Sequence, residues 1–137
     1  LFVLFTKFVN AEVIDINNRE LSNLIEKKIK IIDVRTENEW KSTGIIKGSF
    51  LVSLLNENKK FIFEDWYEMF NNKFGKNKSI IFICASGIRS NYISHLVKKK
   101  DPDRIVYNLK KGINKWISPK TKTLLIQLQE YLQLQVL

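Results

Sequence analysis

Residues 79–90 read Ser79-Ile80-Ile81-Phe82-Ile83-Cys84-Ala85-Ser86-Gly87-Ile88-Arg89-Ser90. Four apolar residues at the start are typical of a buried strand in a parallel sheet. The apolar run stops at Cys84, the only cysteine of the chain. A few small or apolar residues then lead to Arg89, where a helical pattern begins. The stretch therefore predicts a strand, a tight turn and a helix, with a thiol at the carboxyl end of the strand.

This order of elements has a chemical consequence. Successive backbone N–H groups of such a turn converge on the thiol, and the N-terminus of the following helix adds partial positive charge. Arg89 can complete the same ring with a fixed cation. Surroundings of this kind stabilise negative charge on a sulfur atom and hold an anion just above it.

On both sides of this stretch, strand patterns alternate with helix patterns. Alternation of this kind predicts a parallel α/β sheet. In such sheets, sites form at the carboxyl ends of strands, where Cys84 and the pair Asp33 and Arg35 all fall. The expected strands are 12–16, 29–34, 79–83 and 105–109, with a turn and another strand over 45–52. The expected helices are 20–27, 36–43, 64–74 and 90–100, with a turn and a short helix over 110–116.

The chain has 137 residues and neither internal repeats nor a linker, which fits one domain over residues 12–118. Residues 1–11 are strongly apolar and resemble the end of a secretory signal peptide, with Val9 and Ala11 before Glu12. We therefore expect export to a periplasmic or secreted location; a cytoplasmic protein with an N-terminal extension is the alternative. Residues 119–137 are rich in Leu and Gln and predict a C-terminal amphipathic helix or tail. No stretch is long enough to span a bilayer.

Composition limits the partners. The net charge of +9 attracts small anions. Its lysines are scattered in short groups, without the arginine and aromatic interleaving that reads or stacks bases, so no nucleic-acid partner is expected. One cysteine and one histidine could supply at most two ligands to a structural zinc ion, so no metal site is expected.

The turn by itself suggests two chemistries: sulfur transfer through a cysteine persulfide, or phosphate-ester hydrolysis through a cysteinyl-phosphate. The size of the ring separates them. Four residues lie between Cys84 and Arg89, whereas a phosphatase loop has five and usually a histidine where this chain has Ile83. The shorter ring suits one sulfur atom better than a tetrahedral phosphate, which argues against a phosphatase.

Four motifs, in this order, resemble a single-domain rhodanese-like sulfurtransferase over roughly residues 12–118. They are Asp33-Val34-Arg35, Glu39-Trp40 with Gly44 to Gly48, Cys84-Ala85-Ser86-Gly87-Ile88-Arg89-Ser90, and Leu109-Lys110-Lys111-Gly112 with Trp116. The cysteine loop is the specific motif, and the others are weak alone. There are two departures: Ile45 stands where the family often has histidine, and Lys111 replaces the first glycine of a common pair.

The resemblance implies an α/β fold with a mainly parallel central sheet flanked by helices on both faces, and a ping-pong mechanism without a cofactor. Cys84 would attack the outer sulfur of an anionic donor such as thiosulfate or a persulfide, and an acceptor thiol, carried by a protein or a small molecule, or cyanide would remove it. The persulfide would be held by N–H groups of the loop residues Ala85, Ser86, Gly87, Ile88 and Arg89.

Alternatives remain open at this point. Asp33 and Arg35 either attract the donor or form a structural ion pair, and Arg89 either attracts it or braces the loop. His95 lies about two turns beyond Arg89, so we expect a surface or packing role for it. A second hypothesis is a sulfur-carrier or protein-binding module with little turnover, suggested by Ile45, Lys111 and the Leu/Gln-rich tail.

Overall fold

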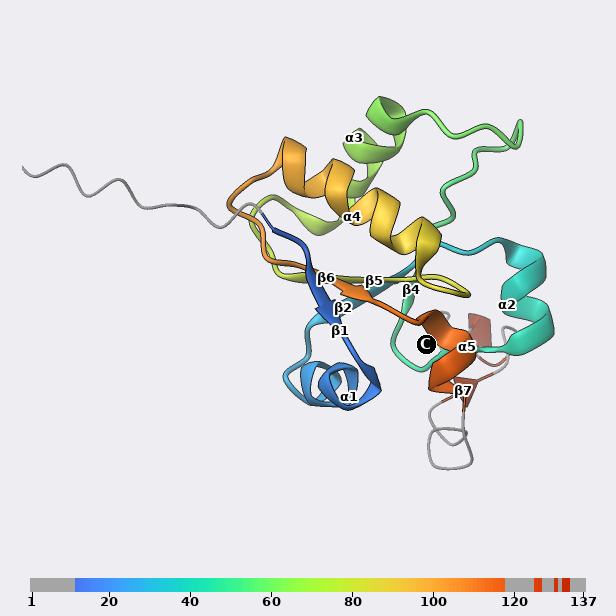
Figure 1. Cartoon of the computed structure of the whole chain (residues 1–137). Helices are drawn as coiled ribbons and strands as arrows, with labels where there is room; N and C mark the ends of the chain where they lie inside the picture. Colours follow the sequence, from blue (N-terminus) through green and yellow to red (C-terminus); the bar gives the residue numbers. More distant parts are fainter. Residues whose placement is uncertain (1–11, 118–124, 127–129, 131, 134–137) are drawn as a thin grey trace, which may run out of the picture.

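The computed structural model describes residues 12–117, 125–126, 130 and 132–133. Strands and helices alternate along most of this length (Figure 1). In chain order, the elements are β1 (Ile14–Ile16), α1 (Asn18–Glu26), β2 (Lys30–Asp33), α2 (Glu37–Thr43), β3 (Ile45–Ile46), β4 (Phe50–Leu51), α3 (Phe63–Phe74), β5 (Ile80–Ile83), α4 (Ile88–Lys100), β6 (Val106–Leu109), α5 (Gly112–Trp116) and β7 (Leu125–Ile126).

Five strands form one parallel sheet in the order β1-β6-β5-β2-β4. Strand β5 lies at its centre, and all four of its residues are buried. In the register between β2 and β5, Asp33 lies opposite Ile83, and the ladder continues with the N–H of Val34 donating to the carbonyl of Ile83 at 3.0 Å. The carboxyl ends of β2 and β5 therefore lie side by side, which brings Asp33, Arg35 and Cys84 to one edge of the sheet.

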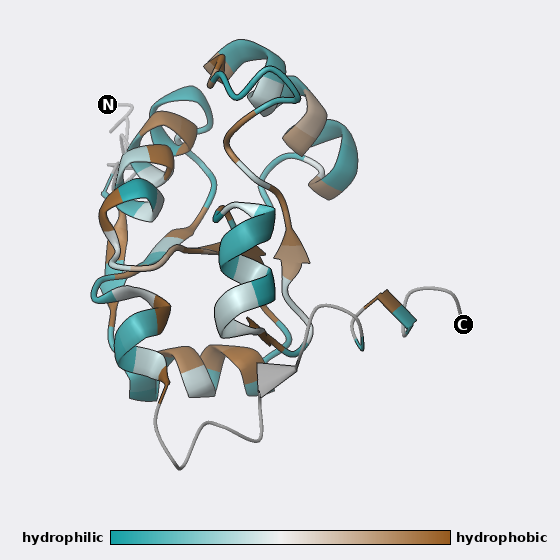
Figure 2. Cartoon of the chain, turned by 90° about the vertical axis from the view of Figure 1, so that its right-hand side faces the viewer, coloured by the Kyte–Doolittle hydropathy of each residue, from teal (hydrophilic) through white to brown (hydrophobic). Residues whose placement is uncertain are grey.

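Helices cover both faces of the sheet, which confirms the predicted α/β architecture. Alternate strand residues point to opposite faces: Ile80 and Phe82 pack against α3 and α4, whereas Ile81 and Ile83 pack against α1 and α5. In Figure 1, α3 and α4 accordingly lie above the sheet and α1 lies below it. Figure 2 shows the strands mainly in brown between helices that carry many teal residues, as expected for a buried sheet.

Helix α2 begins with a capping box. Thr36 Oγ1 accepts from the N–H of Glu39, and the Glu39 carboxylate accepts from the N–H of Thr36. The helix ends at Gly44, whose positive φ of 77° favours glycine. These two ends fix where α2 stands, and they place the Glu39 side chain above the carboxyl ends of β2 and β5.

The structure differs from the sequence predictions in two places. Over residues 45–52 the expected turn is present, but it separates two short strands, β3 and β4, instead of preceding a single strand, and the two belong to different sheets. Leu125 and Ile126 do not continue an amphipathic helix: they form β7, which pairs antiparallel with β3. An isolated two-residue pairing depends on the partner strand rather than on local sequence, so the helical spacing of leucines did not reveal it.

Residues 1–11, and most of residues 118–137, lie outside the described residues, so the export prediction stays a prediction. Among the described helices, none combines the length and apolar character that crossing a membrane requires.

Candidate active site

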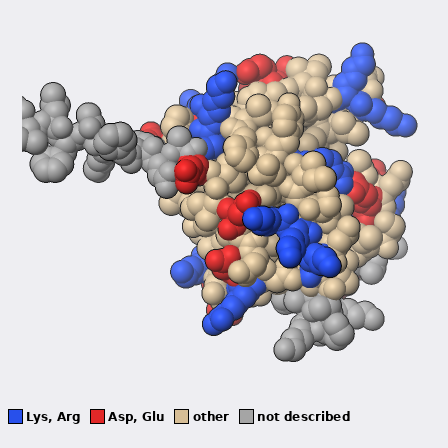
Figure 3. Space-filling model, viewed as in Figure 1, with Lys and Arg blue, Asp and Glu red and all other residues tan. Residues whose placement is uncertain are grey.

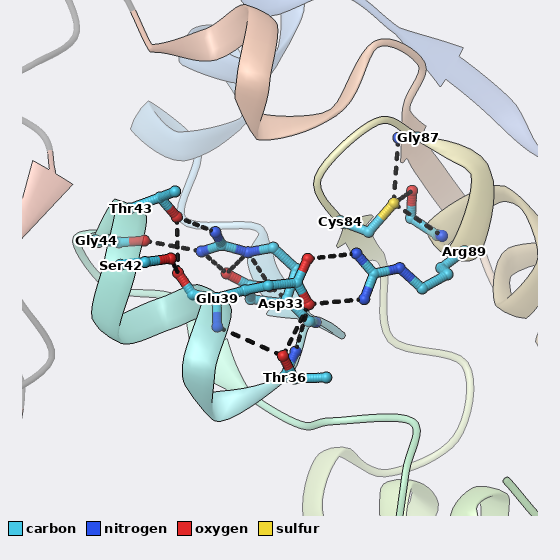
Figure 4. A network of polar contacts seen from close by, with 11 residues as sticks. Asp33, Thr36, Glu39, Ser42, Thr43, Gly44, Cys84, Gly87 and Arg89 are labelled. Carbon is cyan, nitrogen blue, oxygen red and sulfur yellow. Dashed lines mark hydrogen bonds and ion pairs between the residues drawn. The ribbon is translucent and has the colours of Figure 1, made fainter.

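Cys84 directly follows β5 and is fully buried, at 0% exposure. Within the described residues, two backbone N–H groups donate to its Sγ: that of Gly87 at 3.1 Å and that of Ser90 at 3.4 Å. Figure 4 shows the sulfur atom inside the turn that residues 84–90 form, which we call the cysteine turn. Of the five residues predicted to surround the sulfur, Gly87 makes this contact, and Ser90 lies one residue beyond the predicted set.

The turn is held from below by the segment after β6. The carbonyl of Cys84 accepts from the N–H of Ile113 at 2.8 Å, and that of Ala85 accepts from the N–H of Asn114 at 3.1 Å. The backbones also approach closely, because a Cβ on Gly112 would overlap the carbonyl of Ala85, and one on Gly87 would overlap the carbonyl of Lys110. Both glycines have positive φ. The two segments thus fit together only with glycine at these positions.

Lys111, the departure from the usual pair of glycines, is explained by its backbone. Its φ is −103°, which any residue adopts, whereas Gly112 has a φ of +65°. The second departure, Ile45, is buried and packs with Trp40. Neither departure alters the contacts of the cysteine turn.

Arg89 does not point freely into the site but pairs with Glu39 of α2. Its Nη1 and Nη2 donate to the two carboxylate oxygens of Glu39 at 2.8 and 2.6 Å (Figure 4). The Arg89 hydrogen bond lowers the pKa of Glu39 from 4.5 to about 2, against the raising effect of burial. The same hydrogen bond raises the pKa of Arg89, with smaller contributions from the charges of Glu39, Cys84 and Asp33. The pair therefore stays ionised at neutral pH and links α2 to the cysteine turn.

Asp33 and Arg35 form a buried ion pair, with 0% and 1% of their side chains exposed. Arg35 Nη2 donates to Asp33 Oδ2 at 2.7 Å and to the carbonyl of Gly44 at 2.8 Å, and Nη1 donates to Thr43 Oγ1. All of these partners belong to the protein and tie β2 to the end of α2. The contacts favour the structural role for this pair over attraction of a donor.

A polar chain leads away from the sulfur through residues outside the predicted set. Ser90 Oγ lies 3.3 Å from Sγ and donates to Asn108 Oδ1 at 2.7 Å. Asn108 Nδ2 in turn donates to Asp15 Oδ1 at 2.8 Å. A signal for Asn108 does exist in the sequence, since it is an amide within an otherwise apolar strand. His95, as expected, is exposed, and its ring contacts the carbonyl of Asn91 one turn away.

An apolar hollow of about 270 Å³ lies beside Arg89. Its lining comes from the segment after β2, the segment after β4, and α4: Val34, Thr36, Ser53, Leu54, Leu55, Phe61, Arg89 and Tyr92. A larger hollow of about 660 Å³ lies between α1 and the end of β6, but no residue of the cysteine turn lines it. Of these two hollows, the smaller one is lined by a residue of the turn, Arg89.

Charges on the face seen in Figure 3 are mixed, with blue and red side chains interspersed. Among the described residues, no group of three or more His, Cys, Asp or Glu side chains is placed to hold a metal ion.

Comparison with known proteins places this geometry in a family. The model of the Rhodanese-like domain matches residues 17–119. A search of curated proteins finds no match. Among solved structures, a rhodanese-like domain protein from Staphylococcus aureus is similar at 24% identity and a TM-score of 0.60, covering 78% of this chain and 94% of its own.

Two further neighbours carry phosphatases in their descriptions. A Saccharomyces cerevisiae homologue of single-domain rhodanese and the Cdc25 phosphatase catalytic domain aligns at 15% identity and a TM-score of 0.59, over 79% of this chain and 81% of its own. A possible tyrosine phosphatase of unknown function from Rhodopseudomonas palustris aligns at 17% and 0.56, over 79% and 82%. These likenesses show the fold alone, whereas the family model covers most of the chain together with its cysteine turn. This chain belongs to the rhodanese-like domain family.

Proposed function

We propose that the protein is a sulfurtransferase that moves a sulfane sulfur from thiosulfate or a persulfide donor to a thiol or cyanide acceptor through a persulfide on Cys84. The observation that carries the proposal is the turn itself: the only cysteine of the chain directly follows the central strand, and the N–H groups of Gly87 and Ser90 donate to its sulfur. N–H donors fixed around a sulfur atom stabilise negative charge on it without a reorganisation cost.

The reaction balances without a redox partner. The Cys84 thiolate attacks the outer sulfur of thiosulfate, the S–S bond of the donor breaks, and its electron pair leaves on sulfite. An acceptor thiolate then attacks the outer sulfur of the Cys84 persulfide, whose S–S bond breaks and returns the electron pair to Cys84. The proposed partners are thus an anionic donor, drawn by the net charge of +9, and a thiol acceptor that is either small or carried by a protein.

The size of the ring favours sulfur over phosphate. Four residues separate Cys84 from Arg89, and the guanidinium of Arg89 is already occupied by both carboxylate oxygens of Glu39. A phosphoryl group needs several donors around three oxygens, whereas a single sulfur atom needs few. Hydrolysis of an aryl phosphate that disappears in Cys84→Ser would contradict this argument.

The test uses intact mass spectrometry after incubation with thiosulfate and removal of excess donor. We expect the mass of one sulfur atom to be added to the wild-type chain, none to be added to Cys84→Ser, and cyanide to release the added sulfur as thiocyanate. The absence of any adduct with thiosulfate and with glutathione persulfide would refute the proposal.

A second candidate is a sulfur-carrier or binding module with little turnover, which the complete burial of Cys84 favours. Because Cys84 is fully buried, a donor reaches its sulfur only after neighbouring residues move. Slow opening would allow loading but limit turnover. Steady thiocyanate formation over many cycles would exclude this candidate, whereas a single loading event without turnover would support it.

A further inference from the structure

The hydroxyl of Ser90 is the side-chain group that lies against the sulfur of Cys84. Its Oγ is 3.3 Å from Sγ, and Ser90 is fully buried at the start of α4. At this distance, either group could donate the hydrogen bond: the thiol to the hydroxyl, or the hydroxyl to the sulfur. The direction matters, because only a hydroxyl that donates stabilises negative charge on sulfur.

The neighbours of Ser90 decide the direction. A carboxylate only accepts, so the side chain of Asn108 must turn its Nδ2 to Asp15, at 2.8 Å. That orientation directs Asn108 Oδ1 at Ser90 Oγ, at 2.7 Å, and this oxygen can only accept. The single hydrogen of the Ser90 hydroxyl is therefore used on Asn108, and Ser90 presents a lone pair to Cys84.

Two strands and one helix build this chain of contacts: Asp15 lies in β1, Asn108 in the neighbouring β6, and Ser90 in α4. Asn108 is 2% exposed, whereas Asp15 lies at the surface with Lys110 Nζ 3.9 Å from its Oδ2. The contact with the sulfur is thus set by a carboxylate that solvent reaches.

We propose that Asp15 and Asn108 are positioning residues that hold Ser90 as the acceptor of the Cys84 thiol hydrogen, and so withhold its hydroxyl hydrogen from the sulfur. The consequence rests on the proposed function. With Ser90 as acceptor, the resting thiol of Cys84 reacts more slowly with a sulfur donor than it would if only the two backbone N–H groups contacted the sulfur. When the hydroxyl of Ser90 is released from Asn108, it can turn to the sulfur and donate to the attacking anion.

The direct test is the infrared S–H stretching band, measured in mildly acidic buffer. The chain has one cysteine, so Cys84→Ser supplies the blank. A thiol that donates to Ser90 has a weakened S–H bond, so we expect the band to move to higher frequency in Ser90→Ala. In Asp15→Asn, the new amide can also donate, so Asn108 can turn its side chain over and release the Ser90 hydroxyl. We therefore expect a second component in the S–H band of this variant. Asp103→Asn, a change at another exposed aspartate, should leave the band unchanged.

The second test is the rate of alkylation by iodoacetamide at neutral pH. Asn108→Leu frees the Ser90 hydroxyl, and we expect alkylation of Cys84 to accelerate about fivefold, the weight of one hydrogen bond. The double variant Asn108→Leu with Ser90→Ala should lose this gain. A merely structural role for Asn108 would give the same rate in the single and double variants, and that result would overturn the proposal.

Asp15→Asn repeats the rate test at a surface position, in case Asn108→Leu does not fold; here too we expect faster alkylation. An S–H band that does not move in Ser90→Ala would overturn the inference. Both measurements need no sulfur donor, so they decide this proposal separately from the sulfurtransferase proposal: loss of sulfur transfer leaves them informative, and their failure leaves sulfur transfer standing.

Discussion

Replacing Glu39 by glutamine removes the charge that holds Arg89. This contact lowers the pKa of Glu39 from 4.5 to about 2. At 1.36 kcal/mol per pKa unit, the shift would correspond to about 3 kcal/mol of folding free energy. The side chains of Glu39 and Arg89 are 31% and 40% exposed, however, so solvent screens their attraction. After that discount, we expect Glu39→Gln to lower the free energy of unfolding by about 1 kcal/mol at neutral pH.

The pH dependence gives the sign of the effect. The carboxyl group of Glu39 has a lower pKa in the folded protein than in the unfolded chain, so its contribution is complete above about pH 4.5 and is lost as the pH falls toward about 2. Urea unfolding should therefore show a difference in the free energy of unfolding between wild type and variant at about pH 7, and a smaller difference at about pH 3.

The matched control is Glu37→Gln in the same helix. Glu37 is 65% exposed and pairs with Lys41 one turn on, so its loss should cost only about 0.3 kcal/mol. If Glu39→Gln lost no more unfolding free energy than the control, or lost the same amount at both pH values, the role given to the Arg89–Glu39 pair would be refuted.

Three further changes test the rest of the site. Arg35→Leu leaves the Asp33 carboxylate buried without its partner, so urea unfolding should show a free energy of unfolding lower by about 3–5 kcal/mol. If the unpaired carboxylate is the cause, adding Asp33→Asn should restore part of this stability. Gly112→Ala should lower the free energy of unfolding by more than about 1 kcal/mol and slow the loading of Cys84, because its Cβ would overlap the Ala85 carbonyl. The control is Gly48→Ala, where φ is also positive but the space around the Cβ is open. It should lower the free energy of unfolding by only about 1 kcal/mol and leave loading unchanged. If the apolar hollow receives the body of the donor, benzenethiosulfonate should show a lower KM than methanethiosulfonate, and Tyr92→Ala should reduce that difference; equal KM values in the wild type would exclude the hollow as a donor site.

The sequence was sufficient for the architecture because local and long-range signals agree in it. The apolar run Ile80–Ile83 can only be buried between neighbouring strands, and Asn17 and Thr36, residue types that favour helix N-caps, begin α1 and α2. The position of Cys84 at the end of β5 followed from the same run. These features depend on residues close together in the chain.

The contacts of the site could not be predicted in the same way. Glu39 was recognised as part of a motif but not as the partner of Arg89, which lies 50 residues away in the sequence. Asn108 and Asp15 meet only because β1 and β6 are adjacent, and strand order is not encoded in the pattern of either strand. The burial of Arg35 also depends on where α2 ends, since its partners include the carbonyl of Gly44.

Two hydrogen bonds, from the N–H groups of Ile113 and Asn114 in α5 to the carbonyls of Cys84 and Ala85, join the cysteine turn to α5. A displacement of the cysteine turn that lifts these carbonyls must break both bonds at once, so the backbone of Ile113 and Asn114 exchanges its hydrogens with solvent only as fast as the turn opens. Deuterium uptake at these two amides thus becomes a clock for how often the sulfur is uncovered.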